Sequence, residues 1–447
     1  MKEENRKYAQ EAYDIVKHAS QVIGSRLPGS EGEKKYAHYM GEKLREIGIT
    51  PVTEEFEVSP RSSIGGIPYA GWVGLIVSLL IYPALAIWQM WFALAIGTVA
   101  CLVWLVFSVF LYKTWFDMFF KQELSQNTYG ELTPPDGKYD YTIILSAHTD
   151  TSWNWKHSAH GSWHKDKPIF ALVTTYGKVG FGAVCFFLLT AICIFMAVIY
   201  GGAIIFDQAW AYNIIEFSSK FRMLNQALLF LPAVTALGSC FLIMWADPNP
   251  RNASKGAMDN ATGCALSYEV IKYFKENPDK MPPKCRIIDL NCGSEEAGLR
   301  GSMAFAREHR NDDMFKNCWN INIDSVADKE YFEVVIKDDW QFCRFDTDLE
   351  KMFKDTFNEM GIVSKTNGCI HNPVGGCDST PMTKAGAKSV TFAAQNPMLT
   401  YYYHTWLDTA DRFDAETVGD GFEVVLSVID KISAFQQEKG FNGPQKK

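Results

Sequence analysis

A histidine and an aspartate follow a short apolar stretch in the first third of the chain. Residues 142–145 are apolar or β-branched and predict a buried strand, which runs into His148 and Asp150. Side chains two positions apart in an extended chain lie on the same side, so this imidazole and this carboxylate could act together. A lone histidine at a strand end is usually structural, so the chemistry depends on further ligand-type residues downstream.

Four later segments also place such side chains at the predicted end of a strand or in a turn. They are Asp259 in "KGAMDNATG", Glu295 and Glu296 in "CRIIDLNCGSEEAGLRGS", Asp324 in "CWNINIDSVAD" and His404 after the aromatic run of "TYYYHTWLDTADRFD". In α/β proteins, functional groups collect at the carboxyl edge of a parallel sheet. The sequence therefore predicts that these side chains converge with His148.

Two histidines, two aspartates and one or two glutamates form a ligand set that Zn²⁺ prefers. Five ligands are too many for one catalytic tetrahedral zinc that keeps a water molecule. They suit two ions that share a bridging carboxylate, each with an open position. The charge of the ions would also keep the clustered carboxylates ionised.

The adjacent carboxylates Glu295 and Glu296 indicate two different roles. Neighbouring side chains in an extended loop diverge, so one can bind metal while the other faces the substrate. Metal-assisted hydrolysis needs a group that takes a proton from water and delivers it to the leaving amine. A carboxylate beside the metal is placed for that.

Five motifs in this order resemble those of the M28 zinc aminopeptidases. They are His-x-Asp at 148–150, Asp-Asn-x-Thr-Gly at 259–263, Glu-Glu-x-Gly-x-x-Gly-Ser at 295–302, Asn-x-Asp at 322–324 and His-Thr-x-x-Asp-Thr at 404–409. The resemblance covers roughly residues 5–68 and 113–447, without the apolar hairpins described below. It implies an α/β fold of the zinc exopeptidase (phosphorylase/hydrolase-like) type, with a mixed, mostly parallel sheet flanked by helices.

The resemblance also implies two zinc ions per chain. One would be held by His148, Asp259 and Asp324. The second would be held by Asp259, Glu296 and His404, so that Asp259 bridges the two ions.

The catalytic roles implied by the resemblance belong to two further carboxylates. Glu295 would act as general base and then as general acid, and Asp150 would orient His148 through its other ring nitrogen. The implied enzyme is a metallo-aminopeptidase that acts on peptides with a free amino terminus.

The chain departs from the M28 pattern in three places. About 108 residues separate the His148 motif from Asp259, where soluble members have a short loop. Ser379 stands where a histidine is common, which weakens any substrate-pocket role for that segment. Ser325 replaces the glycine often found after the metal-binding aspartate, which matters little because Asp324 is present.

Long uncharged runs predict membrane-spanning helices. Residues 69–112 contain no charged residue and are about twice the length needed to cross a bilayer. Two further uncharged runs lie between Lys178 and Asp207 and between Arg222 and Asp247. We therefore expect about four transmembrane helices in two hairpins, anchored in the lipid bilayer. The expected division is 1–68, 113–178 and 247–447 as one peptidase domain, interrupted by the hairpins 69–112 and 179–246.

Composition restricts the partners and the compartment. A net charge of -8 argues against a nucleic-acid partner, which would require a basic surface. The 11 cysteines show no paired spacing, which favours a reducing compartment. The amino-terminal segment lacks the apolar region of a signal peptide. With basic residues flanking the spans, these features favour a multi-pass membrane protein whose catalytic domain faces the cytosol. The oligomeric state stays open.

Three other functions compete with the aminopeptidase. A glutaminyl cyclase-like enzyme would use one zinc and would not need the complete second ligand set. A non-enzymatic relative would be expected to lose ligands, and all are present here. A transporter would carry ionisable residues within its spans, and these spans have none. The extra histidines His157, His160 and His164, near several tryptophans, predict an interfacial loop rather than another metal site.

Overall fold

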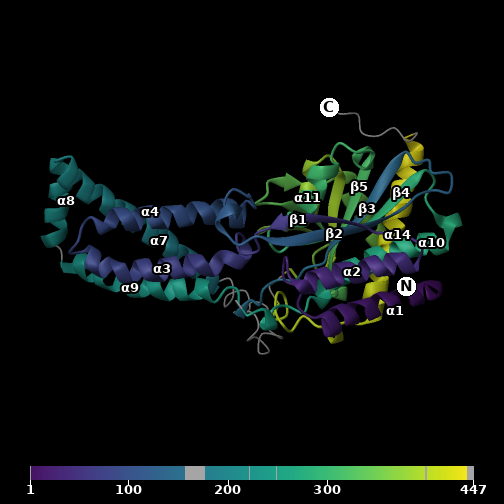
Figure 1. The fold of residues 1–447 in the computed structure, drawn as a ribbon, viewed down its shortest axis with the longest axis horizontal. Helices are drawn as coiled ribbons and strands as arrows, with labels where there is room; N and C mark the ends of the chain where they lie inside the picture. The colour runs from purple at the N-terminus through teal and green to yellow at the C-terminus, as the bar shows by residue number, and fades with distance from the viewer. Residues whose placement is uncertain (1, 157–176, 221, 248, 398–399, 440–447) are drawn as a thin grey trace.

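A mixed sheet flanked by helices forms one end of the molecule, and a bundle of long helices extends from it (Figure 1). The computed structural model describes the whole chain except residues 1, 157–176, 221, 248, 398–399 and 440–447. The predicted α/β fold with a mixed sheet is confirmed. The segment of His157, His160 and His164 lies outside the described residues, so the interfacial loop stays a prediction.

The sheet has nine strands in the described part of the chain. They are β1 (Val52–Val58), β2 (Glu123–Leu132), β3 (Tyr141–His148), β4 (Cys285–Cys292), β5 (Cys318–Val326), β6 (Phe332–Asp338), β7 (Cys343–Arg344), β8 (Cys369–Asn372) and β9 (Lys388–Ala394). Their order is β1-β2-β4-β3-β5-β9-β6-β7, with β8 paired to β6. The central strands β4, β3, β5 and β9 are parallel neighbours, and antiparallel pairings lie towards both edges. Every residue of β3 and β4 is buried, as expected for central strands covered on both faces.

Helices cover both faces of this sheet. The larger core lies under α1 (Arg6–Lys17), α2 (Glu31–Glu46), α10 (Thr262–Glu276), α12 (Thr347–Glu359) and α14 (Ala415–Glu438). The smaller core lies under α11 (Arg300–His309) and α13 (Ser379–Lys384). Successive side chains of a strand point to opposite faces, so Ile143 and Leu145 belong to the larger core and Ile144 to the smaller one.

Two helical hairpins interrupt the sheet domain and pack on each other. The first consists of α3 (Ile67–Ala84) and α4 (Met90–Trp104), which continues to Phe110, and the second of α7 (Gly177–Tyr200) and α9 (Arg222–Ile243). The short helix α8 (Ala209–Lys220) lies at the end of the bundle farthest from the sheet (Figure 1). The bundle has its own apolar core, in which Val77, Trp91 and Leu189 are buried.

Small residues allow α3 and α9 to approach closely. A side chain at Gly74 would place its Cβ 2.4 Å from Oγ of Ser239, so a larger residue there would displace Ser239 or separate the helices. One turn further, the hydroxyls of Ser78 and Thr235 share a hydrogen bond of 2.7 Å. Glycine and serine contacts of this kind are typical of helix packing in membranes.

Three helical segments in the described chain are long and apolar enough to cross a membrane. They are Ile64–Ala84, Met90–Phe110 and Lys178–Ile205. The fourth predicted span corresponds to α9, of which Phe230–Ile243 is the apolar helix within the fully described residues. The number of spans and the hairpin boundaries therefore stay predictions. Strands from before, between and after the hairpins nevertheless join one sheet, because β1 precedes α3, β2 and β3 precede α7, and β4–β9 follow α9.

Candidate metal centre

The carboxyl ends of three neighbouring strands carry most of the predicted site. β3 ends at His148, the loop after β4 carries Glu295 and Glu296, and Asp324 lies near the end of β5. Since β4, β3 and β5 are parallel neighbours, these ends lie on the same edge of the sheet. The turns before α10 and α14 add Asp259 and His404.

Asp259 lies between the two imidazoles. Its Oδ1 is 3.0 Å from Nε2 of His148, and its Oδ2 is 2.9 Å from Nε2 of His404. Nε2 of His148 is also 3.7 Å from Oδ1 of Asp324, and Nε2 of His404 is 3.0 Å from Oε1 of Glu296. The five predicted ligands therefore form two groups that share Asp259, and the ligand atoms of each group lie within 4.8 Å of one another.

The chemistry of these two groups fits bound zinc. Imidazole and carboxylate are zinc ligands, and four of the five side chains are buried. Oε1 of Glu296 is buried beside Nε2 of His404, yet it accepts no hydrogen bond from any described residue. Burial by itself would raise the pKa of Asp259, but the two imidazoles hold it below its usual range. A cation between these donors would satisfy the lone pairs that face one another.

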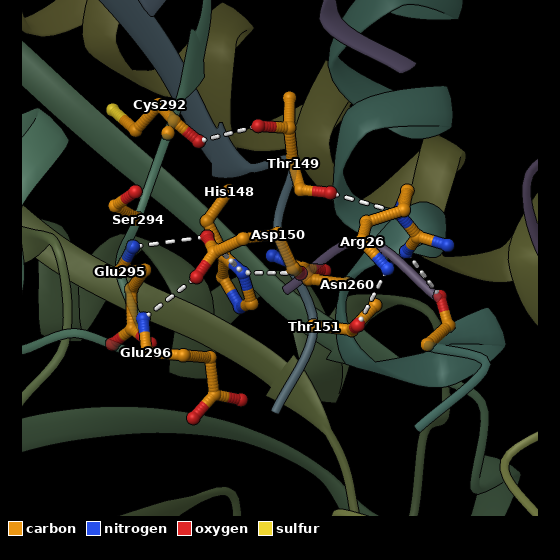
Figure 2. Close-up of polar contacts among 12 residues, drawn as sticks. Arg26, His148, Thr149, Asp150, Thr151, Asn260, Cys292, Ser294, Glu295 and Glu296 are labelled. Atoms are coloured by element: carbon orange, nitrogen blue, oxygen red, sulfur yellow. Dashed lines mark hydrogen bonds and ion pairs between the residues drawn. The ribbon is translucent and has the colours of Figure 1, made fainter. Parts of the chain in front are cut away.

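Asp150 lies beside Nδ1 of His148 and also contacts a neighbouring loop. Nδ1 of His148 lies 3.2 Å from the backbone oxygen of Asp150 and 3.4 Å from its Oδ1. The carboxylate of Asp150 accepts hydrogen bonds from the backbone nitrogens of Glu295 and Glu296, each at 2.9 Å (Figure 2). Asp150 thus holds the loop that carries both glutamates, a contact that the sequence did not reveal.

Asp408 plays the same part for the loop that carries Asp259. Its carboxylate accepts hydrogen bonds from the backbone nitrogens of Met258, at 2.9 Å, and Asp259, at 3.1 Å. Asn260 then joins this loop to β5, because its Nδ2 donates to the backbone oxygen of Ile323 at 2.9 Å. Both residues lie within motifs noted in the sequence, as Asp-Asn-x-Thr-Gly and His-Thr-x-x-Asp-Thr, but their contacts required the structure.

Arg26 is a further supporting residue that no motif indicated. It is fully buried, and its Nε donates to the backbone oxygen of Thr149 at 2.8 Å (Figure 2). One guanidinium nitrogen donates to the backbone oxygen of Gly256 at 2.8 Å. Arg26 therefore joins the segment after β3 to the segment before Asp259.

Glu295 lies beside the two ligand groups but belongs to neither. It is partly buried, and burial raises the pKa of its carboxyl group well above the usual range, an effect that the imidazole of His148 opposes. Glu295 lines the same cavity as the ligands. A carboxylate free of metal in this position can accept and release a proton.

Aromatic rings enclose His404. The ring of Tyr403 stacks on its imidazole with centroids 3.9 Å apart, and Trp155 approaches edge-on at 4.3 Å. The backbone nitrogen of Trp155 also donates to the backbone oxygen of His404 at 2.8 Å. These contacts fix the ring and exclude water from one side of the cluster.

A cavity of about 490 Å³ opens beside the cluster. Its wall includes His148, Asp259, Glu295, Glu296 and Asp324, together with residues of both helical hairpins. This volume lies within the range of small-molecule sites. The site is therefore accessible to a substrate of limited size.

Comparison with known proteins finds a family match in the carboxy-terminal part of the chain. Residues 244–429 match the model of peptidase family M28, which confirms the resemblance seen in the motifs. The matched region contains Asp259, Glu296, Asp324 and His404, whereas His148 lies outside it.

Relatives of known identity share part of the chain. Endoplasmic reticulum metallopeptidase 1 of Mus musculus is 24% identical over 186 residues, which make up 40% of this chain and 19% of the mouse protein. The protein of the same name from Rattus norvegicus is 24% identical over 182 residues, 39% of this chain and 19% of the rat protein. The alignments thus span about a fifth of these relatives.

Solved structures share the fold. BSAP, a zinc aminopeptidase from Bacillus subtilis, has a TM-score of 0.51 and 14% identity, covering 95% of this chain and 94% of its own. A glutaminyl cyclase from Bacteroides thetaiotaomicron, bound to N-acetylhistamine, has a TM-score of 0.50 and 14% identity, covering 94% and 97%. At these identities the similarity concerns the fold alone.

Proposed function

Because residues 244–429 carry a peptidase family M28 region, we propose that the chain is a membrane-anchored metallo-aminopeptidase with two zinc ions. The observation that supports this most directly is the position of Asp259, whose two carboxylate oxygens each face a different histidine at 2.9–3.0 Å. His148 and Asp324 complete one position, and Glu296 and His404 complete the other. When bound there, zinc supplies an activated water and polarises the carbonyl of the scissile bond.

Glu295 moves the proton in this proposal. It accepts a proton from the attacking water and delivers it to the nitrogen of the leaving amine. The raised pKa of its carboxyl group suits a group that must hold a proton during the reaction. Asp150 keeps Glu295 in place through the backbone nitrogen of that residue.

The free amino terminus of the substrate is the recognition element. Of the carboxylates in the cavity wall, Asp259, Glu296 and Asp324 would be offset by the two zinc ions, so Glu295 is the one left to attract an α-ammonium group. Acetylation would remove the positive charge and with it this attraction. The helical hairpins anchor the enzyme in a bilayer, since three of their segments are long and apolar enough to cross one.

The test is hydrolysis of leucyl-coumarin by the purified full chain, together with metal analysis. We expect activity that a chelator abolishes and zinc restores, about two zinc ions per chain, and little turnover of N-acetyl-leucyl-coumarin. Full activity with one zinc per chain would instead favour a glutaminyl cyclase-like centre. Equal turnover of the acetylated substrate would contradict recognition of the amine.

A further inference from the structure

The cavity at the ligand cluster has a second wall made by the helical hairpins. All four long helices contribute to it, through Ile67 of α3, Leu102 of α4 and Leu105 just beyond it, Ala183 and Phe186 of α7, and Leu242 of α9. We call these six residues the apolar wall. None of their side chains carries a polar atom. A single cavity therefore adjoins both the catalytic carboxylates and the helices that we assign to the bilayer.

Backbone chemistry indicates what can lie against the apolar wall. Beyond the first turn of each helix, the amide groups of these helices are hydrogen-bonded within the helix and are not available to a ligand. An extended peptide would leave its own N–H and C=O groups unpaired there, and each such group would cost free energy. An alkyl chain has no polar groups and gains from burial against these side chains. The apolar wall therefore suits an alkyl chain better than a peptide.

Charge restricts the other end of the ligand. In the described part of the chain, the ionisable side chains that line the cavity are carboxylates, histidines, Tyr112, Tyr403 and Cys377, without a lysine or an arginine. Besides the cluster they include Glu333 and His371. In the zinc-loaded site, Glu295 is the carboxylate of the cluster left to pair with an ammonium group of the substrate.

We infer that the substrate is an aminoacyl amide that carries a long alkyl chain, with a free α-ammonium group at the carboxylates and the chain along the apolar wall. This inference rests on the proposed function and specifies its substrate class. Hydrolysis breaks the amide C–N bond, adds the hydroxyl of water to the carbonyl carbon and returns a proton to the leaving amine.

Ala183 and its neighbour Val184 provide a matched pair of variants. Ala183 lines the cavity, whereas the side chain of Val184 is 56% exposed on the outside of the bundle. A phenylalanine at position 183 would occupy space along the apolar wall. The same residue at position 184 would add equal apolar surface outside the cavity. An effect seen only at position 183 would show that the alkyl chain occupies the cavity. Partitioning of long-chain substrates into the bilayer would not distinguish the two variants.

The experiment compares leucine butylamide with leucine dodecylamide, using the zinc-loaded full chain in lipid nanodiscs. We expect kcat/KM to be at least about tenfold higher for the dodecyl compound, because additional methylene groups are buried. Ala183→Phe should lower the dodecyl-to-butyl ratio by about tenfold, and Val184→Phe should leave the ratio unchanged. A second series, in which the alkyl chain replaces the leucine side chain, tests whether the chain belongs to the acyl side. An increase of kcat/KM with alkyl-chain length in either series supports the inference.

A second variant protects the test against misfolding of Ala183→Phe. Leu102→Ala enlarges the cavity, so it should shift the preferred alkyl chain to a greater length. The inference is overturned if kcat/KM does not depend on alkyl-chain length in either series. It is also overturned if the variants at positions 183 and 184 both give the wild-type dodecyl-to-butyl ratio. Cleavage of apolar tetrapeptide amides as fast as the dodecyl compound would overturn it as well. Failure of the proposed function is distinguishable, because the butylamide would then not be cleaved at all.

Discussion

The carboxylate of Asp150 and the backbone nitrogen of Glu296 are joined by a hydrogen bond of 2.9 Å. The other oxygen of Asp150 accepts from Glu295, and Asp408 accepts in the same way from the loop of Asp259. Two carboxylates outside the proposed ligand set therefore each hold two consecutive backbone N–H groups of a site loop. Hydrogen bonds to an ionised acceptor are among the stronger ones in proteins, so the loops are positioned before any metal or substrate binds.

Replacing Asp150 with asparagine tests this positioning role. The amide keeps one acceptor oxygen but turns an NH₂ group towards a backbone N–H, so one of the two hydrogen bonds is lost. We expect Asp150→Asn to weaken zinc binding by about 10–100-fold and to lower kcat. Zinc titration and the thermal midpoint of unfolding are the measurements. The exposed Asp279→Asn serves as a control and should bind zinc like the wild type. Wild-type zinc affinity in Asp150→Asn would show that the loop does not need this contact.

Replacement by glutamine should have different effects at the adjacent residues Glu295 and Glu296. Glu295→Gln should retain zinc but lose about 10²–10⁴ in kcat, because the amide cannot accept the proton. Glu296→Gln should lose zinc from the position that it shares with His404. Metal content and steady-state kinetics of both variants are compared. If Glu295→Gln loses metal and Glu296→Gln keeps it, the two assignments are exchanged.

A histidine far from the metal centre gives a predicted pH dependence of stability. Nε2 of His309 lies 2.8 Å from Oε1 of Glu54, and Nδ1 lies 2.8 Å from Oδ2 of Asp312. The contact with Glu54 is the main cause that raises the pKa of His309 from 6.5 to about 9, against the opposing effect of burial. The contribution of protonated His309 to the free energy of unfolding is complete below pH 6.5 and is lost as the pH rises through about 9.

Thermal unfolding of the full chain between pH 6 and 9.5 measures this effect. The thermal midpoint of the wild type should fall across this pH interval. The midpoint of His309→Gln should fall less, because glutamine does not titrate. Tyr129 also donates to Glu54 but stays protonated in this range, since burial raises its pKa. If the thermal midpoint falls equally with pH in the wild type and in His309→Gln, the pH dependence belongs to other groups.

The orientation in the membrane can be tested by labelling. Basic residues flank the spans where the chain joins the sheet domain, and such residues favour the cytoplasmic side. They are Arg61, Lys113, Lys121, Lys178, Arg251 and Lys255. In intact cells an impermeant maleimide should therefore label Asn213→Cys, on α8 at the far end of the bundle, but not Lys35→Cys on α2. Labelling of Lys35→Cys should appear only after permeabilisation. The reverse pattern would place the peptidase domain outside the cytoplasm.

The sequence by itself determined the features that depend on local patterns. The uncharged run 69–112 predicts its helices because transfer into an apolar environment depends on composition over about 20 residues. The motifs containing His148, Asp259, Glu295, Asp324 and His404 were visible because each is short and contiguous. The sequence also predicted that these residues meet at one edge of the sheet, because most of them follow the predicted ends of strands.

Only the tertiary structure decided how these pieces meet. That Asp259 faces His148 with one oxygen and His404 with the other depends on the path of the chain over more than a hundred residues on each side. The contacts of Arg26, Asp150 and Asp408 are with backbone groups, which carry no signature in the sequence. The shared cavity arises because both hairpins return to the same edge of the sheet. Such proximity is a property of packing, so no local pattern could reveal it.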